Sequence, residues 1–161
     1  MSAYGGEKGN RMIEIALGAD HAGYTLKEAL KRYFDETGVS YCDFGTFSEE
    51  SVDYPDIAKK TCEAVLDGRC RLAVLVCGTG VGIGISANKI KGIRACVCSE
   101  VYSAKMSRLH NDANTLAIGG RVIGVETAKE IVNVFIHTQF LGGRHQTRVD
   151  KISDLEYKKY E

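Results

Sequence analysis

Residues 72–86 read LAVLVCGTGVGIGIS, an apolar run that passes directly into glycines at every second position. A near-continuous apolar run is typical of a parallel strand that is buried on both faces of its sheet. The glycines that follow expose backbone N–H groups at the start of a helix, an arrangement that binds anions. The first reactive side chain is Cys77, at the junction of strand and turn. The stretch therefore predicts an anion-binding turn, a site of thiolate chemistry, or both.

The rest of the chain repeats this alternation of strand and helix. Further apolar runs begin at residues 12, 39, 93 and 114, and segments of helical period cover residues 24–38, 55–68, 101–110 and 125–143. A last helix is expected over residues 144–161, with Val149, Ile152 and Leu155 along one stripe. Strands that alternate with helices form right-handed βαβ units. The sequence therefore predicts a single doubly wound (Rossmann-like) α/β domain with a five-stranded parallel sheet and helices on both faces. Ligands bind beyond the carboxyl ends of such strands.

Length and charge indicate one ordinary globular domain. The 161 residues include 21 Lys and Arg and 21 Asp and Glu, so the net charge is zero. A balanced charge predicts no general attraction to nucleic acid or to membranes, and no apolar run approaches the length of a membrane span. Residues 1–11, MSAYGGEKGNR, lack the apolar stretch of a signal peptide and are expected to form a flexible N-terminal segment.

The six cysteines predict neither a metal site nor a disulfide framework. No two of them form a Cys-x-x-Cys pair, which argues against a zinc ribbon and a thioredoxin-like motif. Cys96 and Cys98 alternate within an apolar run and are expected on the same face of a strand. Several others lie in apolar runs, where free cysteine behaves as a small apolar residue. Unpaired cysteines are typical of a reducing compartment, and we expect a cytoplasmic protein.

The loop after the first strand does not match a nucleotide-binding motif. Gly18 and Gly23 have the spacing of a P-loop, but Tyr24 stands where that motif needs its lysine. Asp20 in the loop would also repel a triphosphate. One interpretation of Asp20 is a helix N-cap. With His21 beside it at a strand end, the other interpretation is a pair of polar groups that face a hydroxylated ligand.

The glycine turn after Cys77 does not match a dinucleotide-binding motif either. That motif reads G-x-G-x-x-G, and Ile83 stands where the third glycine belongs. Backbone amides at a helix N-terminus stabilise a thiolate, so one interpretation of Cys77 is a reactive thiol. The other is a buried cysteine beside a structural turn.

Polar residues also precede and follow the last strand. His110 and Asn111 come before it, and Arg121 comes after its IGG end. His110 by itself fits an ordinary surface or core residue as well as a proton donor. Arg144 and Arg148 are four residues apart and share one face of the last helix. They can form a solvated face or grip one phosphate.

Five separated motifs together resemble a known family. They are GADHAGYTLK, DYPDIA, CGTGVGIGISANKIKGIRA, HNDANTLAIGGR and GGRHQTRV. In this order they are similar to the sugar-phosphate isomerases that include ribose-5-phosphate isomerase B and the galactose-6-phosphate isomerase subunits. The resemblance covers about residues 12–150 and implies an isomerase domain over residues 12–161. It implies an aldose–ketose isomerase of the pentose phosphate pathway that interconverts D-ribose 5-phosphate and D-ribulose 5-phosphate, with no cofactor and no metal.

The resemblance also implies roles for the matching residues. Cys77 resembles the base that takes a proton from the sugar carbon next to the carbonyl; another branch of the family uses a glutamate at the position that is Ile83 here. His110 resembles the acid that opens the furanose ring. The turn amides and the Thr79 hydroxyl resemble the site that holds the enediolate. The matching positions that bind sugar or phosphate are Asp20, His21, Tyr54, Gly78, Gly80, Val81, Gly82, Asn111, Arg121, Arg144 and Arg148.

Finally, the resemblance implies a homodimer, or a tetramer, whose active sites are shared between subunits. The base and the ring-opening histidine of one site would come from different subunits, and the C-terminal helix would reach a partner subunit. Two alternatives stay open: an isomerase of a six-carbon sugar phosphate, such as galactose 6-phosphate or allose 6-phosphate, and a non-catalytic sugar-phosphate sensor on the same fold. The presence of Cys77, Thr79 and His110 together argues against the sensor.

Overall fold

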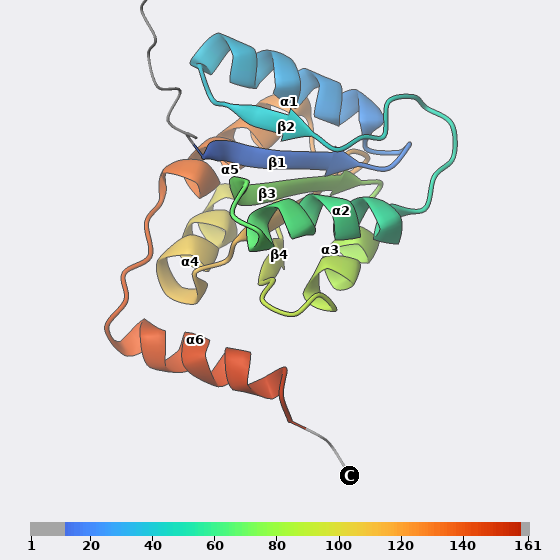
Figure 1. Ribbon diagram of the computed structural model, residues 1–161. Coiled ribbons are helices and arrows are strands. Elements are labelled where there is room, and N and C mark those ends of the chain that lie inside the picture. The colour runs from blue at the N-terminus through green and yellow to red at the C-terminus, as the bar shows by residue number, and fades with distance from the viewer. Residues whose placement is uncertain (1–11, 159–161) are drawn as a thin grey trace, which may run out of the picture.

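The five strands form one parallel sheet in the order β2-β1-β3-β5-β4 (Figure 1). The structure is a computed structural model that describes residues 12–158, so the segment expected to be flexible, residues 1–11, lies outside the described residues. The strands are β1 (Ile13–Ala19), β2 (Tyr41–Asp43), β3 (Cys70–Cys77), β4 (Ala95–Val97) and β5 (Thr115–Gly119). The predicted five-stranded parallel sheet is confirmed. The chain reverses its direction across the sheet between β1 and β3, and such a switch point is where α/β sheets bind ligands.

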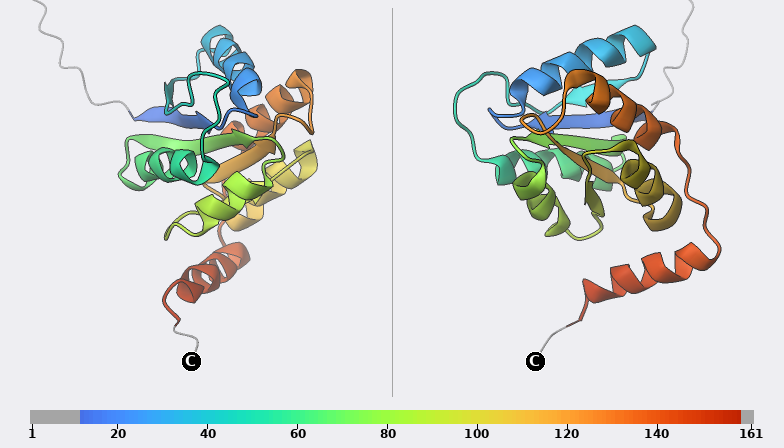
Figure 2. Two further views of the ribbon diagram at one scale, coloured as in Figure 1. Left: turned by 90° about the vertical axis from the view of Figure 1, so that its right-hand side faces the viewer. Right: turned by 180° about the vertical axis from the view of Figure 1, so that it is seen from behind.

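Helices cover both faces of the sheet (Figure 2), as predicted. Within the described residues they are α1 (Tyr24–Thr37), α2 (Tyr54–Leu66), α3 (Val81–Asn88), α4 (Val101–Asn111), α5 (Val125–His137) and α6 (Arg144–Leu155). Helices α1, α4 and α5 bury side chains against one face, whereas α2 and α3 bury theirs against the other.

Strand β3 shows why the apolar run before Cys77 lies at the centre of the sheet. All of its residues except Arg71 are buried. Leu72 and Val74 pack on the side of α1, α4 and α5, whereas Leu75 and Cys77 pack on the side of α2 and α3. Because successive strand residues point to opposite faces, a strand with helices on both sides requires a continuous apolar run.

Helix α5 ends earlier than the sequence predicts. The helical period suggested residues 125–143, but the helix ends at His137 and the next residue is extended. The chain turns there toward α4, where the Leu141 amide donates a hydrogen bond to the Leu109 carbonyl. The local period could not reveal this contact between distant residues.

The last helix, α6, stands away from the sheet and lies beside α4 of its own chain (Figures 1 and 2). Val149 is its buried residue, whereas Ile152 and Leu155 are exposed. The helix was predicted to reach residue 161 but ends at Leu155. Just beyond it, the carboxylate of Glu156 accepts a hydrogen bond of 2.9 Å from the Gly92 amide.

A buried lysine ties α1 to β2. Lys27 is fully buried, and its ammonium group lies 2.5 Å from the Asp43 carboxylate, which also pairs with Lys31 at 2.9 Å. Burial raises the pKa of Asp43, but hydrogen bonds from Lys27, the Gly45 amide and Lys31 outweigh it and hold the pKa below its usual value. The network fixes the end of β2, from which the loop to α2 departs.

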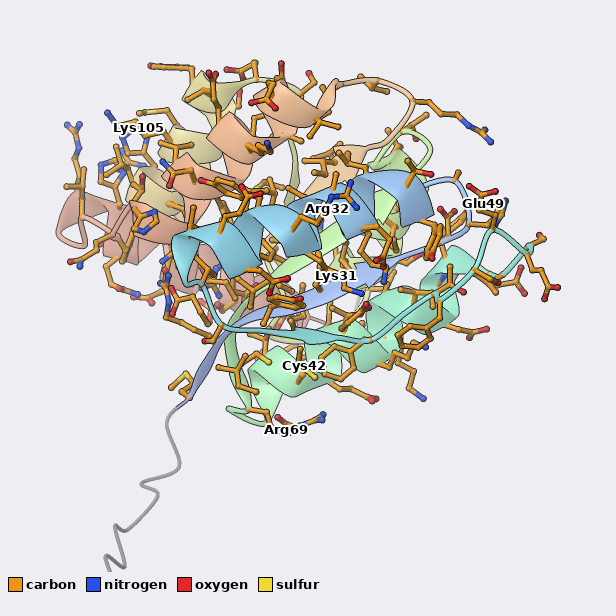
Figure 3. All side chains as sticks on the ribbon, turned by 90° about the horizontal axis from the view of Figure 1, so that it is seen from above. Lys31, Arg32, Cys42, Glu49, Arg69 and Lys105 are labelled. Carbon is orange, nitrogen blue, oxygen red and sulfur yellow. The ribbon has the colours of Figure 1, made fainter. Side chains whose placement is uncertain are left out.

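That loop, residues 44–53, passes the carboxyl ends of the strands. Figure 3 shows Glu49 in this loop at one end of the molecule and Lys105, on α4, at the other. The two ends of the sheet are therefore bordered by different elements. Among residues 12–158, no helix combines the length and the apolar character needed to cross a membrane.

Candidate active site

Three loops meet at the carboxyl ends of β1, β3 and β5, which are neighbours in the sheet. Backbone hydrogen bonds join them: the Asp20 amide donates to the Val76 carbonyl at 3.1 Å, and the Gly120 amide donates to the Cys77 carbonyl at 2.8 Å. The Arg121 amide donates to the Gly78 carbonyl at 3.0 Å. The backbone at this edge is thus held by contacts between loops that are distant in sequence.

Two glycines are required for these loops to approach one another. Gly80 has a φ of +80°, and a Cβ atom there would lie 2.9 Å from the Ile118 carbonyl carbon. A Cβ atom at Gly23 would lie 2.4 Å from the Val76 carbonyl oxygen. Any side chain at either position would push the loops apart, so these glycines are structural requirements of the site.

Cys77 ends β3 and is 4% exposed. Its sulfur accepts a hydrogen bond of 3.1 Å from the Gly80 amide, and α3 begins at the next residue, Val81. The Thr79 hydroxyl accepts a hydrogen bond of 3.2 Å from the Val81 amide. Amide hydrogen bonds and a helix N-terminus both stabilise negative charge. The turn therefore combines a thiol with donors suited to an anion.

Asp20 is buried in the loop after β1, and one of its carboxylate oxygens accepts 3.0 Å hydrogen bonds from the Ala22 and Gly23 amides. It is not the N-cap of α1, because that position is Gly23. Its carboxylate instead shapes the loop and leaves a second oxygen for other partners. The N-cap interpretation is therefore wrong in detail, although Asp20 does bind backbone amides next to the helix.

His21 is linked to the loop before α2. Its Nδ1 accepts a hydrogen bond of 3.2 Å from the Val52 amide. A neutral imidazole that accepts at Nδ1 carries its proton on Nε2. His21 can therefore donate a hydrogen bond from Nε2 to an oxygen of a ligand.

Tyr54 and Arg121 border the glycine turn. The Tyr54 ring packs on the turn so closely that a Cβ atom at Gly82 would lie 2.8 Å from its Cζ. An Arg121 guanidinium nitrogen lies 3.6 Å from the position of a Cβ atom at Gly78. A phenol and a guanidinium group thus flank the turn that holds Cys77. The structure therefore brings the predicted residues of the glycine turn together with Asp20, His21, Tyr54 and Arg121 at the carboxyl ends of the strands.

The remaining predicted residues form a second group. His110, Asn111, Arg144 and Arg148 line a cavity of about 440 Å³ between α4 and α6, together with His145. The rings of His110 and His145 are stacked, with centroids 4.2 Å apart and an angle of 9° between their planes. Desolvation lowers the pKa of His145, and electrostatic repulsion from the neighbouring His110, Arg144 and Arg148 side chains adds to this effect. The cavity therefore concentrates positive charge and suits an anion.

His145 is the residue of this cavity that was not among the predicted site residues. The sequence places it directly after Arg144, between two glycines and Arg148. This position beside Arg144 was the sequence signal that could have identified His145 as a site residue. Its stacking on His110, however, depends on the packing of α6 against α4.

The two groups do not meet within one chain. Cys77 pairs with Gly119 at the carboxyl end of β5, whereas His110 lies shortly before Thr115, which begins that strand. Four residue steps along a strand span about 13 Å. In addition, His110 is at the end of α4, which returns the chain to the amino ends of the strands. Cys77 and His110 therefore lie at opposite ends of the strands, Cys77 at the carboxyl ends and His110 at the amino ends.

No group of three or more His, Cys, Asp or Glu side chains within residues 12–158 is arranged to hold a metal ion. The site described by these residues consists of backbone amides, a thiol, a carboxylate, a carboxamide, hydroxyl groups, imidazoles and guanidinium groups. Such groups can bind an oxyanion, bind a phosphate and move a proton.

Comparison with known proteins identifies relatives that span nearly the whole chain. The sequence model described as Ribose/Galactose Isomerase matches residues 15–152. The chain is 50% identical to ribose-5-phosphate isomerase B of Escherichia coli over 148 residues, which are 92% of this chain and 99% of that protein. It is 40% identical to D-erythrulose-4-phosphate isomerase of Pectobacterium atrosepticum, over 91% of this chain and 97% of that protein.

A solved structure agrees with these matches. The structure of ribose-5-phosphate isomerase B from Clostridium thermocellum superposes with a TM-score of 0.88 at 50% identity, covering 89% of this chain and 97% of that chain. The resemblance inferred from the five motifs is confirmed.

Proposed function

Because the chain belongs to the ribose/galactose isomerase family, we propose that it interconverts D-ribose 5-phosphate and D-ribulose 5-phosphate. The observation that carries the proposal is the Cys77 thiol at the mouth of a turn of amide donors, in a chain that is 50% identical to ribose-5-phosphate isomerase B of Escherichia coli. Aldose–ketose isomerisation needs a base, donors for the enediolate oxygens and an anchor for the phosphate. Each of these has a candidate among the described residues.

Cys77 is the proposed base. As a thiolate it takes the proton from C2 of the open-chain aldose, and the electron pair of that C–H bond moves to form an enediolate. The hydroxyl proton moves from O2 to O1, and the thiol returns its proton to C1 as the C2–O bond becomes a carbonyl, which gives the ketose. The amide hydrogen bond from Gly80 supports a negatively charged sulfur, and the Thr79 hydroxyl and the turn amides are the proposed donors to the enediolate oxygens.

His110 is the proposed acid for ring opening, and it would act on substrate bound next to Cys77 of a partner subunit. The opposite positions of Cys77 and His110 in one chain support this arrangement. A two-fold dimer would bring the cavity of one subunit to the turn of the other and create two composite sites. In this proposal α6 carries Arg144 and Arg148 to the partner, where they bind phosphate together with Arg121. The residues proposed to bind the sugar or the phosphate beside them are Asp20, His21, Tyr54 and Asn111.

A shorter substrate is a second candidate, because the chain is also similar to D-erythrulose-4-phosphate isomerase of Pectobacterium atrosepticum at 40% identity. The family description names galactose as well, which keeps six-carbon sugar phosphates among the candidates. Apolar space for one carbon changes binding by only about 1–3 kcal/mol. The substrate must therefore be decided by comparing rates.

The test compares kcat/KM for ribose 5-phosphate, D-erythrulose 4-phosphate, galactose 6-phosphate and allose 6-phosphate. We expect the highest value for ribose 5-phosphate. A higher value for a four- or six-carbon substrate would replace the proposed substrate, and no isomerisation of any of them would favour the sensor. Cys62→Ala, which changes a buried cysteine of α2 that is not among the proposed site residues, is the control for variants of Cys77.

A further inference from the structure

The end of α4, which carries His110 and Asn111, has an unusual backbone. The helix ends at Asn111, and the next residue, Asp112, is left-handed with a φ of +45°. Among residues 12–158 it is the one residue other than glycine with a positive φ. Glycine adopts this conformation at helix ends without strain, whereas any other residue adopts it at a cost in free energy. The side chain of Asp112 is therefore expected to do something that glycine cannot.

The Asp112 carboxylate lies between two guanidinium groups. One oxygen accepts a hydrogen bond of 2.9 Å from Arg108 of α4, and the other accepts one of 3.3 Å from Arg94, which directly precedes β4. Arg94 also donates to the Asn111 and Asp112 carbonyls, at 3.0 and 2.8 Å. Arg108 donates to the Ala113 carbonyl at 2.5 Å. Carbonyls at a helix end have no partners within the helix, and the two arginines supply them here.

Both arginines are themselves fixed to the core of the domain. Arg108 is buried, and its guanidinium group lies 5.6 Å from the centroid of the Phe135 ring of α5. The Arg94 amide donates a hydrogen bond of 2.9 Å to the side-chain oxygen of Asn114, just before β5. The Asp112 carboxylate therefore ties the end of α4 to α5 and to the segments that lead into β4 and β5.

The two residues before Asp112 belong to the cavity between α4 and α6. His110 and Asn111 line it, and the His110 ring stacks on His145 of α6. Since α6 buries only Val149, the firmly held side of this stack is α4. The direction of a helical side chain follows its backbone. The position of the His110 ring thus depends on how the last turn of α4 is held.

We propose that Asp112 is a positioning residue of the isomerase: through Arg94 and Arg108, its carboxylate holds the last turn of α4 so that the His110 imidazole faces the ring oxygen of the substrate. The inference rests on the proposed role of His110 in ring opening. Asp112 does not line the cavity, so it acts through His110 and not on the sugar. Displacing a catalytic group by about 1 Å can lower a rate by about 10²-fold.

The main test is Asp112→Gly. Glycine adopts the left-handed backbone freely, so this variant keeps the helix end and removes only the carboxylate. If Asp112 did no more than end the helix, the variant would behave as wild type. We expect kcat/KM for ribose 5-phosphate to fall at least about tenfold, with a much smaller loss for D-erythrose 4-phosphate, which needs no ring opening. The ratio of the two values is the measured quantity.

Two further variants grade the effect. Asp112→Asn keeps an oxygen that accepts from one arginine and should retain more activity than Asp112→Gly. Arg94→Lys keeps the charge but cannot bind both carbonyls and the carboxylate. It should lower the ratio as Asp112→Gly does, and it replaces that variant if Asp112→Gly fails to fold.

A second measurement does not depend on activity. Stacked aromatic rings shift each other's proton NMR signals, so the imidazole signals of His145 report the stack on His110. In Asp112→Gly we expect these signals to move toward their positions in His110→Asn, which lacks the second ring. Asp67→Gly is the matched control, because Asp67 also caps the end of a helix, α2, and pairs with Arg69 at 2.8 Å. It should leave both the signals and the kinetic ratio unchanged.

The outcomes separate this proposal from the proposed function. If His110→Asn lowers kcat/KM equally for both substrates, the ring-opening role of His110 and the positioning role of Asp112 fail together. If His110→Asn is selective but Asp112→Gly leaves the ratio or the His145 signals as in wild type, the proposed function stands and Asp112 is not a positioning residue. The His145 signals decide the proposal on their own if D-erythrose 4-phosphate is not turned over.

Discussion

The two ends of the parallel strands carry groups of residues that are built in different ways. At the carboxyl edge, Cys77 is buried and the three loops are joined by backbone hydrogen bonds and close glycine contacts. At the other edge, the cavity of His110 is formed with α6, a helix that stands away from the sheet and buries only Val149. Proton transfer at carbon needs fixed geometry, whereas long arginine side chains can adjust to a phosphate. The rigid edge, at the carboxyl ends of the strands, therefore suits the proposed base, and the open edge, at the cavity of His110, suits the proposed capture of the substrate.

The largest expected effect tests the rigid edge. Cys77→Ala should lower kcat by about 10²–10⁴-fold, because a general base commonly contributes that much. Steady-state assays with ribose 5-phosphate measure the loss, and Cys62→Ala should retain nearly full activity. Near-normal turnover by a folded Cys77→Ala protein would rule out Cys77 as the base.

Mixing variants tests whether the two edges serve one site. Cys77→Ala chains and His110→Asn chains should each be nearly inactive alone. After co-refolding at random pairing, half of the dimers are mixed and one of their two sites is intact, so about a quarter of all sites should recover. Activity of the mixture that does not exceed the sum of the separate variants would contradict a shared site.

A substrate that cannot form a ring sharpens the role of the open edge. D-erythrose 4-phosphate has its phosphate on the oxygen that would close a furanose, so it needs no ring opening. His110→Asn should lower kcat/KM for ribose 5-phosphate by about 10²-fold and affect D-erythrose 4-phosphate much less. Equal losses for both substrates would show that His110 does not act in ring opening.

The glycine contacts of the rigid edge predict a loss of stability. Gly80→Ala forces an alanine into a φ of +80° and against the Ile118 backbone, which should cost about 1–3 kcal/mol in the free energy of unfolding. Gly124→Ala is the matched control, because its φ is −77° and a Cβ atom there meets nothing within 4 Å. Urea unfolding compares the two. Equal destabilisation would mean that the contact at Gly80 is unimportant.

The smallest expected effect is a pH dependence at β2. The pKa of Asp43 is lowered in the folded state, so its stabilising contribution is present above its unfolded pKa of about 3.9 and is lost as the pH falls through the folded pKa. Asp43→Asn should therefore lower the urea midpoint near neutral pH, and the difference from wild type should shrink in acid. Glu130→Gln on α5 is the control. A difference that does not change with pH would contradict the assignment.

Much of the fold followed from local patterns. The apolar run before Cys77 predicted a central strand, and it forms β3, because a strand between two helical layers needs apolar residues on both sides. Tyr24 and Ile83 excluded two nucleotide motifs, since each stands where the motif needs a different residue. The five motifs identified the family. The ends of α5 and α6 were predicted too late in the chain, and residues just beyond each helix contact distant residues that local periodicity does not reveal.

The sequence by itself determined the order of strands and helices, the glycine turn at Cys77 and the residue types of the candidate site. These depend on side-chain periodicity and on backbone freedom, which act over a few residues. Only the tertiary structure decided that His110 lies at the opposite ends of the strands from Cys77, that His145 stacks on His110, and that Ser107 contacts Cys96. These relations depend on how helices pack against the sheet and against one another, and residues far apart in sequence meet only when that packing is complete.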